Sequence, residues 1–490
     1  MEKLICSVSG IRGKVGKTLT FSEAYKTTLY FYKEYLKEKR YCGEIKIILG
    51  KDDKKSGNAL ILGIKEAIED IIKRKGAKIK LIYLGVTSTP MIEWAIKNYK
   101  AAGGINITAS HNPVEWNGIK LFGRDGMLLG KKEMEKINDR LARADFPELP
   151  RTDLVQQYNE WTITRVKDAI DLVSGKKGKG EEIFAEIRKH NYRVVIDACS
   201  KETAKIPWQF LIHLGLKKKN ILVINSSSIE NSQRRLEPAP PYLGNLKKAI
   251  KKTGADIGFA FDPDQDRLVV MPLVSEEHTL LLCGKFLLEL QRYNSNKYIK
   301  NIPVNLSTSS AWDDIASDYG IHIIRTGIGE VNVVKAMQEN NSLFGGEGNG
   351  GVILGNVTYC RNSTVGMALI LAYLAWTGKK IKELEMELPE YVLIKSKLKI
   401  SPGENQEKNM DKVISRINGS VKDVNKIDGY KIFFRDDSWV QLRPSNTEPI
   451  IRIFAEAKVY KSRKKTEKKV KKTIETISNT LEGGGKCPMK

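Results

Sequence analysis

Three carboxylates stand at alternate positions in the segment DPDQDR, as Asp262, Asp264 and Asp266. Carboxylates at this spacing can converge on one hard cation from a tight loop. A calcium-binding EF-hand is excluded, because Arg267 stands where that loop requires glycine and Leu273 where it requires glutamate. Three acids so close together repel one another unless a cation or Arg267 compensates their charge. The pattern therefore favours a metal site over a solvated acidic turn.

A serine stands beside a histidine in the segment TASHNP, where Ser110 precedes His111. A hydroxyl next to a base can be activated as a nucleophile, and Pro113 fixes the backbone just beyond the pair. A hydrolase triad is poorly supported, because no G-x-S-x-G elbow surrounds Ser110. Taken alone, the pair is more simply a helix cap or an ordinary loop serine.

A glycine-rich segment, GGEGNGG over residues 345–351, permits close backbone approach and positive φ angles. Within it, Glu347 and Asn349 could hydrogen-bond the hydroxyl groups of a sugar. A flexible turn between strands is the competing interpretation. A calcium-binding β-helix is not favoured, because the segment occurs in only one copy.

A fourth segment, RPSNTEP, begins at Arg443 and combines an arginine with two hydroxyl side chains and exposed backbone N–H groups. Arg452 follows it closely. Such a set of donors suits a phosphate dianion. A surface turn with capping residues is the alternative.

The segment GIRGKVGKT over residues 10–18 resembles a Walker A loop, but one residue too many separates Gly10 from Gly16. A nucleoside-triphosphatase function therefore loses its main support. Arg12, which is flanked by glycines, is still a candidate phosphate contact.

Short β-branched apolar runs alternate with longer amphipathic segments along the chain. This alternation predicts α/β units with mixed, largely parallel sheets. The length of 490 residues predicts three or four domains at roughly 100–200 residues each. We expect strands at Ile45–Leu49, Lys80–Leu84, Val194–Asp197, Ile221–Ile224 and Ile257–Phe261, and helices at Phe21–Lys39 and Ala59–Lys75.

The chain is strongly basic, with 82 lysines and arginines against 58 acidic residues and a net charge of +24. Such an excess is typical of nucleic-acid binding, but it also attracts small anionic substrates. The densest basic run, Lys461 to Lys472, has no interleaved aromatic residues of the kind that single-strand binding uses. A solvated helix face explains this run, so the charge alone does not identify a partner.

The sequence predicts a cytoplasmic protein. Its longest apolar stretch, Gly366 to Trp376, is far shorter than the roughly 20 residues of a membrane-spanning helix. The first residues lack the apolar core of a secretory signal. Six cysteines are scattered without C-x-x-C pairs, which indicates free thiols in a reducing compartment.

The order of these segments resembles that of the α-D-phosphohexomutase superfamily, which includes phosphoglucomutase, phosphomannomutase and phosphoglucosamine mutase. The resemblance runs from SVSGIRG at Ser7 through TASHNP, DPDQDR and GGEGNGG to RPSNTEP, and covers essentially the whole chain. It implies three related α/β domains followed by a smaller C-terminal α+β domain. We expect domain I at residues 1–150 with the phosphoserine loop, domain II at 151–275 with the metal loop, domain III at 276–385 with the sugar loop, and domain IV at 386–490 with the phosphate loop.

The resemblance also implies which residues form the reacting end of the site, where phosphate passes to and from the sugar. Ser110 would carry the phosphate, and this phosphate with the three aspartates would bind one Mg²⁺ per active site. Arg12, His111 and Lys120 would line this end, with Arg267 beside the metal loop. Phosphoryl transfer to and from the sugar would pass through a hexose 1,6-bisphosphate, which also serves as activator.

The other end of the substrate would be selected and held by residues of the last two loops. Glu347 and Asn349 would select sugar hydroxyls. The phosphate that is not reacting would be held by the residues Arg443, Ser445, Asn446 and Thr447, with Arg452 nearby.

The chain departs from the family pattern at two positions. Asn349 replaces a serine that many members carry in the sugar loop. Gly327, in the segment RTGIGE, stands where a lysine is often found. The role of general acid or base must therefore fall to His111 or Lys120.

The combination of SVSGIRG, EWNGIK, GGEGNGG and CRNSTVGMAL is closest to phosphoglucosamine mutases, which predicts conversion of glucosamine 6-phosphate to glucosamine 1-phosphate. A phosphomannomutase/phosphoglucomutase with the same mechanism is the alternative. A basic nucleic-acid-binding protein with vestigial enzyme loops is disfavoured, because Ser110 and the three aspartates are intact. The preferred hexose, the oligomeric state (monomer or homodimer) and the extent of Ser110 phosphorylation stay open.

Overall fold

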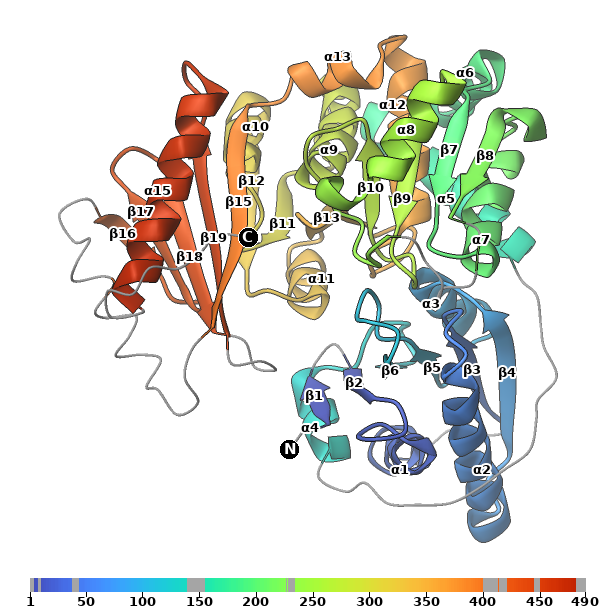
Figure 1. The fold of residues 1–490 in the computed structure, drawn as a ribbon. Coiled ribbons are helices and arrows are strands. Elements are labelled where there is room, and N and C mark those ends of the chain that lie inside the picture. The colour runs from blue at the N-terminus through green and yellow to red at the C-terminus, as the bar shows by residue number, and fades with distance from the viewer. Residues whose placement is uncertain are drawn as a thin grey trace.

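Four β-sheets follow one another along the chain in the computed structural model (Figure 1). The structure describes residues 4–7, 10–37, 44–138, 155–225, 227, 234–399, 413, 421–444 and 450–481. The predicted phosphate-loop residues Ser445, Asn446 and Thr447 lie outside these ranges. Helices pack on the first three sheets, which contain parallel strand pairs, and the last sheet is antiparallel. The predicted fold class is confirmed, whereas the divisions after residues 150, 275 and 385 stay predictions.

The first sheet has six strands in the order β1-β2-β6-β5-β3-β4. Its parallel strands β3 and β5 are buried because α1 and α2 cover one face of the sheet and α3 covers the other. Its elements are β1 (Ile5–Ser7), β2 (Gly10–Lys14), α1 (Phe21–Tyr30), the π-helix η1 (Phe31–Leu36), β3 (Ile45–Lys51), α2 (Gly57–Lys75), β4 (Ile79–Val86), α3 (Thr89–Asn98), β5 (Gly103–Ile107), β6 (Trp116–Phe122) and α4 (Lys131–Asn138). The predicted helix Phe21–Lys39 is thus an α-helix only as far as Tyr30.

The second sheet has the order β10-β9-β7-β8, with β7 parallel to both of its neighbours. The runs predicted as strands become β7, β8 and β9 with the predicted bounds. The elements are α5 (Val155–Ser174), α6 (Lys179–His190), β7 (Val194–Asp197), α7 (Lys201–His213), η3 (Lys218–Asn220), β8 (Ile221–Ile224), η5 (Pro240–Tyr242), α8 (Gly244–Thr253), β9 (Ile257–Phe261) and β10 (Leu268–Met271).

The third sheet, in the order β12-β11-β13-β14, shares one hydrophobic core with the second. Helix α12 lies in this core, which explains why the stretch Gly366 to Trp376 is apolar on all sides. The elements are α9 (Glu277–Gln291), β11 (Asn301–Asn305), α10 (Ala311–Tyr319), β12 (His322–Thr326), α11 (Glu330–Glu339), β13 (Phe344–Glu347), β14 (Gly351–Leu354), α12 (Ser363–Thr377) and α13 (Ile381–Met386).

The fourth sheet is antiparallel, in the order β15-β19-β18-β17-β16, and lies at one end of the molecule (Figure 1). Helix α15 packs on it through Val470, Ile474 and Ile477, while most lysines of this helix are exposed, as a solvated face requires. The elements are β15 (Tyr391–Lys399), β16 (Val421–Asn425), β17 (Tyr430–Phe434), β18 (Trp439–Pro444), β19 (Ile450–Lys458) and α15 (Arg463–Leu481).

Among the described helices, none combines the length and the apolar character that crossing a lipid bilayer requires. The described cysteines Cys6, Cys199, Cys283 and Cys360 are free thiols, as their spacing predicts.

Candidate active site

Ser110 lies in the loop that leaves β5, and its side chain is almost fully buried. Its φ of 53° is in the left-handed region, which a residue other than glycine adopts only at a cost. The Ser110 N–H donates to Thr108 Oγ1 at 2.8 Å, and the Ser110 hydroxyl donates to Asp262 Oδ2 at 2.8 Å. The predicted nucleophile and the predicted metal loop therefore meet, although 152 residues separate them.

The predicted residue His111 contacts this hydroxyl, and the predicted residue Arg12 binds the same loop through Asn112. His111 Nδ1 lies 3.2 Å from Ser110 Oγ, and Arg12 donates to Asn112 Oδ1 at 2.8 Å. Burial lowers the pKa of His111 well below its ordinary value, and the cations Arg267 and Arg12 lower it further. The imidazole is therefore neutral at neutral pH and can accept a proton.

Lys54, a buried lysine that the sequence analysis missed, holds the same loop through its backbone. Lys54 donates to the carbonyl oxygens of Asn112 and Trp116, each at 3.1 Å. Burial lowers the pKa of Lys54, against the opposing charges of Asp52 and Asp264. Nothing in the run KDDKK distinguishes this buried lysine from the exposed Lys55 beside it, so only the fold identifies it.

The three predicted aspartates follow β9 and are fully buried. One carboxylate oxygen from each lies within 4.8 Å of the others, which is the arrangement of a cation site. Asp264 Oδ1 and Asp266 Oδ1 are buried and have no hydrogen-bond partner within the described part of the chain. Oxygen ligands in this number and proximity fit a hard divalent cation.

The surroundings of the aspartates shift the pKa values of Asp262 and Asp266 in opposite directions. Burial, together with repulsion from Asp266 and Asp264, raises the pKa of Asp262 well above its ordinary value. Burial would also raise the pKa of Asp266, but the cations Arg361 and Lys120 hold it well below its ordinary value. Arg267 lies 3.7 Å from carboxylate oxygens of both Asp262 and Asp266. The loop therefore holds negative charge that a cation would compensate.

The metal loop is fixed against the first sheet by two side chains. Lys120, on β6, donates to Asp264 Oδ2 at 2.6 Å and lies 3.4 Å from Asp266 Oδ2. Thr89, at the start of α3, donates to Asp264 through its N–H and its hydroxyl, each at 2.9 Å. Burial lowers the pKa of Lys120, but Asp264 and Asp266 raise it more, so this lysine is charged at neutral pH.

Arg361, which the sequence analysis did not assign to the site, joins the metal loop to the sugar loop. Its guanidinium donates to Asp266, to Glu347 and, at 3.2 Å, to Glu330. These three carboxylates raise its pKa well above the ordinary value, although burial alone would lower it. The sequence signal was the segment CRNSTVGMAL, but a buried arginine cannot be told from an exposed one before the fold is known.

The predicted sugar-selecting residue Glu347 ends β13 and is buried. Its carboxylate accepts from Asn305 Nδ2 at 2.7 Å, from the Gly329 N–H at 3.1 Å and from Arg361. Burial would raise the pKa of Glu347, but Arg361 and Asn305 lower it more. Asn349 Oδ1 is buried without a hydrogen-bond partner among the residues described.

The predicted phosphate-holding residue Arg443 lies on β18, and its Nε donates to Asp428 Oδ1 at 2.7 Å. Arg452 is exposed on β19, directly opposite Arg443 in the sheet register. Two arginines are thus adjacent on the inner strands β18 and β19, close in sequence to the segment 445–449. Asp428 is a further residue that the sequence analysis missed.

Gly327, which stands where the resemblance led us to expect a lysine, could take a Cβ atom with a small shift of one neighbouring side chain. A Cβ atom here would lie 3.2 Å from Asn332 Nδ2, the far end of a flexible side chain. The glycine is therefore not required by packing, and no lysine charge enters the site from this position.

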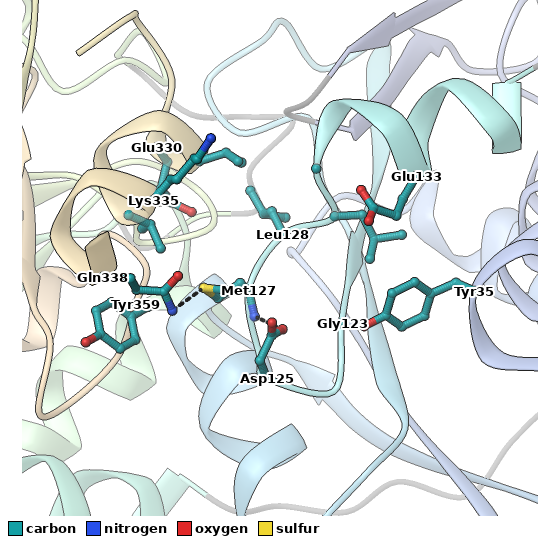
Figure 2. Close-up of a pocket in the computed structure, with 14 residues that line it drawn as sticks. Tyr35, Gly123, Asp125, Met127, Leu128, Glu133, Glu330, Lys335, Gln338 and Tyr359 are labelled. Atoms are coloured by element: carbon teal, nitrogen blue, oxygen red, sulfur yellow. Dashed lines mark hydrogen bonds between the residues drawn. The ribbon is translucent and has the colours of Figure 1, made fainter. Parts of the chain in front are cut away.

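A crevice of about 240 Å³ lies beside the site, between the segment 123–130 and helix α11 (Figure 2). Figure 2 shows Gln338 and Met127 meeting across it, where Gln338 Nε2 lies 3.0 Å from Met127 Sδ. Glu330 lines the crevice, but Ser110, the three aspartates and Glu347 do not. The crevice separates the first and third sheets and is distinct from the site around Ser110.

Comparison with known protein families gives matches along most of the chain. The models of the three alpha/beta/alpha domains of phosphoglucomutase/phosphomannomutase match residues 3–148, 178–272 and 275–391. The model of the C-terminal domain of the same family matches residues 394–472.

Curated proteins resemble the chain over nearly its whole length. A phosphoglucomutase/phosphomannomutase of Thermococcus kodakarensis is 31% identical, over 97% of this chain and 98% of that protein. A phosphoglucosamine mutase of Prochlorococcus marinus is 30% identical, over 97% of this chain and 99% of that protein. The crystal structure of a putative phosphomannomutase from Thermus thermophilus has a TM-score of 0.75 at 21% identity, over 98% of this chain and 99% of that one, which shows a common fold.

Proposed function

The chain belongs to the phosphoglucomutase/phosphomannomutase family and is a phosphohexomutase, and on this premise we propose that Ser110 is its phosphate carrier. The enzyme would interconvert hexose 6-phosphate and hexose 1-phosphate through a hexose 1,6-bisphosphate. The observation that carries the proposal is the 2.8 Å hydrogen bond from the Ser110 hydroxyl to Asp262 in the aspartate loop. A phosphate on this oxygen would enter the cation site directly.

We propose Mg²⁺ as the cation, held by Asp262, Asp264 and Asp266 together with the phosphate on Ser110. The partnerless buried oxygens of Asp264 and Asp266 fit such an ion. When bound, the ion supplies charge neutralisation for the phosphoryl group during transfer. Lys120 binds Oδ2 of Asp264, and Arg361 binds Oδ2 of Asp266. These two cations therefore orient the carboxylates.

In the first transfer, a sugar hydroxyl oxygen forms a bond to the phosphorus on Ser110, and the bond from phosphorus to Ser110 Oγ breaks. The proton of the sugar hydroxyl passes to a base, and the leaving Ser110 Oγ takes up a proton, so the serine hydroxyl is restored. We assign the role of base to His111 rather than Lys120, because the imidazole is neutral and lies 3.2 Å from Ser110 Oγ, whereas Lys120 is charged. In the second transfer, after the bisphosphate turns over, the Ser110 hydroxyl gives its proton to a base and Oγ forms a bond to the other phosphorus. The bond from that phosphorus to the sugar oxygen breaks, and the sugar oxygen takes up a proton.

The remaining predicted residues would bind the parts of the substrate that do not react. Glu347 and Asn349 would bind sugar hydroxyls, since both present oxygens at the end of β13. Arg443, with Ser445, Asn446 and Thr447, would hold the distal phosphate, and Arg452 would add positive charge beside it. Arg12 and Arg267 would stabilise the reacting phosphate.

We propose glucosamine 6-phosphate as the preferred substrate, supported by the names of relatives such as the phosphoglucosamine mutase of Prochlorococcus marinus. Phosphomannomutase/phosphoglucomutase activity is the second candidate, favoured by the name of the Thermococcus relative. We also propose the cytoplasm as the compartment, in keeping with the free cysteines.

The test is turnover of the 6-phosphates of glucosamine, glucose and mannose by one preparation, with Mg²⁺ and the matching bisphosphate. We expect the highest kcat/KM with glucosamine 6-phosphate. A higher value with mannose or glucose phosphate would reverse the substrate assignment, and no turnover with any of them would contradict the mutase. A salt-dependent nucleic-acid binding assay on the same sample tests the basic-protein alternative.

A further inference from the structure

Asp428 lies on the turn between β16 and β17, where the fourth sheet meets the third. One carboxylate oxygen, Oδ1, accepts from Arg443 Nε at 2.7 Å. The other, Oδ2, accepts from the backbone N–H of Ile328 at 2.8 Å. A single side chain therefore joins the predicted phosphate-holding arginine to the segment that follows β12 in the third sheet.

The turn that carries Asp428 is held in place from two sides. Gly429 has a φ of 73°, and a Cβ atom on it would overlap the carbonyl oxygen of Leu442 on β18. Gln441 donates to the Asp428 carbonyl oxygen at 3.1 Å and accepts from Ser307 at 2.7 Å. Because the backbone is fixed in this way, the carboxylate has a defined position relative to both sheets.

The segment that receives Asp428 also contacts the sugar loop. The next N–H along the chain, that of Gly329, donates to Glu347 Oε1 at 3.1 Å. Gly329 has a φ of 120°, which glycine tolerates and other residues rarely adopt. Consecutive N–H groups, those of Ile328 and Gly329, thus reach two different carboxylates.

The contacts form one connected series of charged hydrogen bonds. It runs from Arg443 to Asp428, through the backbone of residues 328–329 to Glu347, and from Glu347 through Arg361 to Asp266. The phosphate-holding arginine, the sugar loop and the metal loop are thus linked without a gap.

We propose that Asp428 is the positioning residue of the distal-phosphate site, which sets the Arg443 guanidinium relative to the sugar loop. This inference rests on the proposed function. Holding an arginine through Nε fixes the plane of its guanidinium and directs its terminal nitrogens away from the partner. Those nitrogens form the fork that binds a phosphate, so Asp428 prepares Arg443 for a ligand that arrives from the cleft.

The first test is calorimetric binding of glucosamine 1-phosphate to wild-type protein and to Asp428→Asn. An asparagine keeps the shape but can accept only one of the two hydrogen bonds. We expect the Kd to rise about 10-fold, the worth of one hydrogen bond to a charged group. Asp428→Glu keeps the charge but displaces it and should also raise the Kd. Asp423→Asn, an exposed acid on β16 of the same sheet, is the matched control and should bind as wild type does.

The second test asks whether Asp428 acts through Arg443. In an Arg443→Ala background, Asp428→Asn should change the Kd by less than about 2-fold, because its partner is gone. Transfer of phosphate from phosphorylated Ser110 to glucosamine, which has no distal phosphate, should be the same in Asp428→Asn and wild type. A general structural defect would slow that transfer as well.

The outcomes separate this inference from the function on which it rests. An unchanged Kd in Asp428→Asn, or an equal effect with and without Arg443, would overturn the inference while leaving the mutase intact. A wild-type protein that binds no hexose monophosphate would overturn both.

Discussion

The two ends of the proposed site are built differently. At the reacting end, Asp264 and Asp266 are fully buried and are bound by Lys120 from the first sheet and Arg361 from the third. At the holding end, where the phosphate that is not reacting would bind, Arg443 forms an ion pair with Asp428. These two side chains are 26% and 21% exposed. The reacting end is thus desolvated, whereas the holding end is partly exposed to water.

This difference suits the two tasks of a mutase. Phosphoryl transfer depends on charges that are placed before the reaction, because reorganising them would add to the barrier. Retention of a bisphosphate that must turn over requires contacts that can be broken and made again in each cycle. We therefore expect damage to the reacting end to abolish chemistry, and damage to the holding end to affect binding.

The largest expected effect is that of removing divalent cations. Full chelation should abolish turnover, because the three aspartates then repel the phosphate on Ser110, and added Mg²⁺ should restore it. Asp264→Asn should weaken the restoration, measured as the Mg²⁺ concentration that gives half-maximal rate. Asp168→Asn, which changes an exposed acid on α5, is the control. Full activity in chelator would contradict the cation site.

Arg361→Ala should come next. It leaves Glu330 and Glu347 buried without their paired cation and removes one of the cations around Asp266. Breaking buried ion pairs in this way typically destabilises a protein by about 3–5 kcal/mol. We expect a lower Tm and a fall in kcat/KM of roughly 100-fold or more. Arg165→Ala, which removes an exposed arginine paired with Asp168, should leave both unchanged. A variant of Arg361 with wild-type kcat/KM would show that the metal and sugar loops are not joined through this residue.

Arg443→Ala should affect binding more than chemistry. We expect the KM for the hexose monophosphate to rise by roughly 10- to 100-fold, and turnover to depend more on added bisphosphate, because the intermediate escapes. Arg443→Lys should recover only part of the loss, since an ammonium cannot bind a phosphate in bidentate geometry. If KM is unchanged and only the phosphorylation of Ser110 falls, the division into two ends is wrong.

The smallest effect concerns the pH dependence of stability through Glu277, a buried acid at the start of α9. Burial raises the pKa of Glu277 to about 8, with Lys395 opposing the shift. A carboxyl with a raised pKa binds more protons when folded than when unfolded, so its presence lowers stability as pH rises from about 4.5 to about 8. Glu277→Gln removes this loss, so Tm of the variant minus Tm of wild type should increase with pH over that range. A difference that does not vary with pH would show that Glu277 is ionised throughout.

The sequence predicted the strands and the loops that follow them because both are local. Buried β-branched runs such as Ile257–Phe261 have the composition of covered strands, and the three aspartates directly follow this one. Arg361 and Asp428 were missed because their partners are distant: Arg361 binds Asp266 across 95 residues and Asp428 binds Ile328 across 100. Charged residues of this kind look the same in a sequence whether they are exposed or buried.

The central claim is that phosphate travels through Ser110, and peptide mapping by mass spectrometry tests it most directly. Protein incubated with glucose 1,6-bisphosphate and Mg²⁺ should carry phosphate on the Ser110 peptide. Added glucosamine 6-phosphate should remove it in step with the appearance of glucosamine 1,6-bisphosphate. Ser110→Ala should fold normally and take up no phosphate. Phosphate found on another residue, or turnover that continues in Ser110→Ala, would contradict the account.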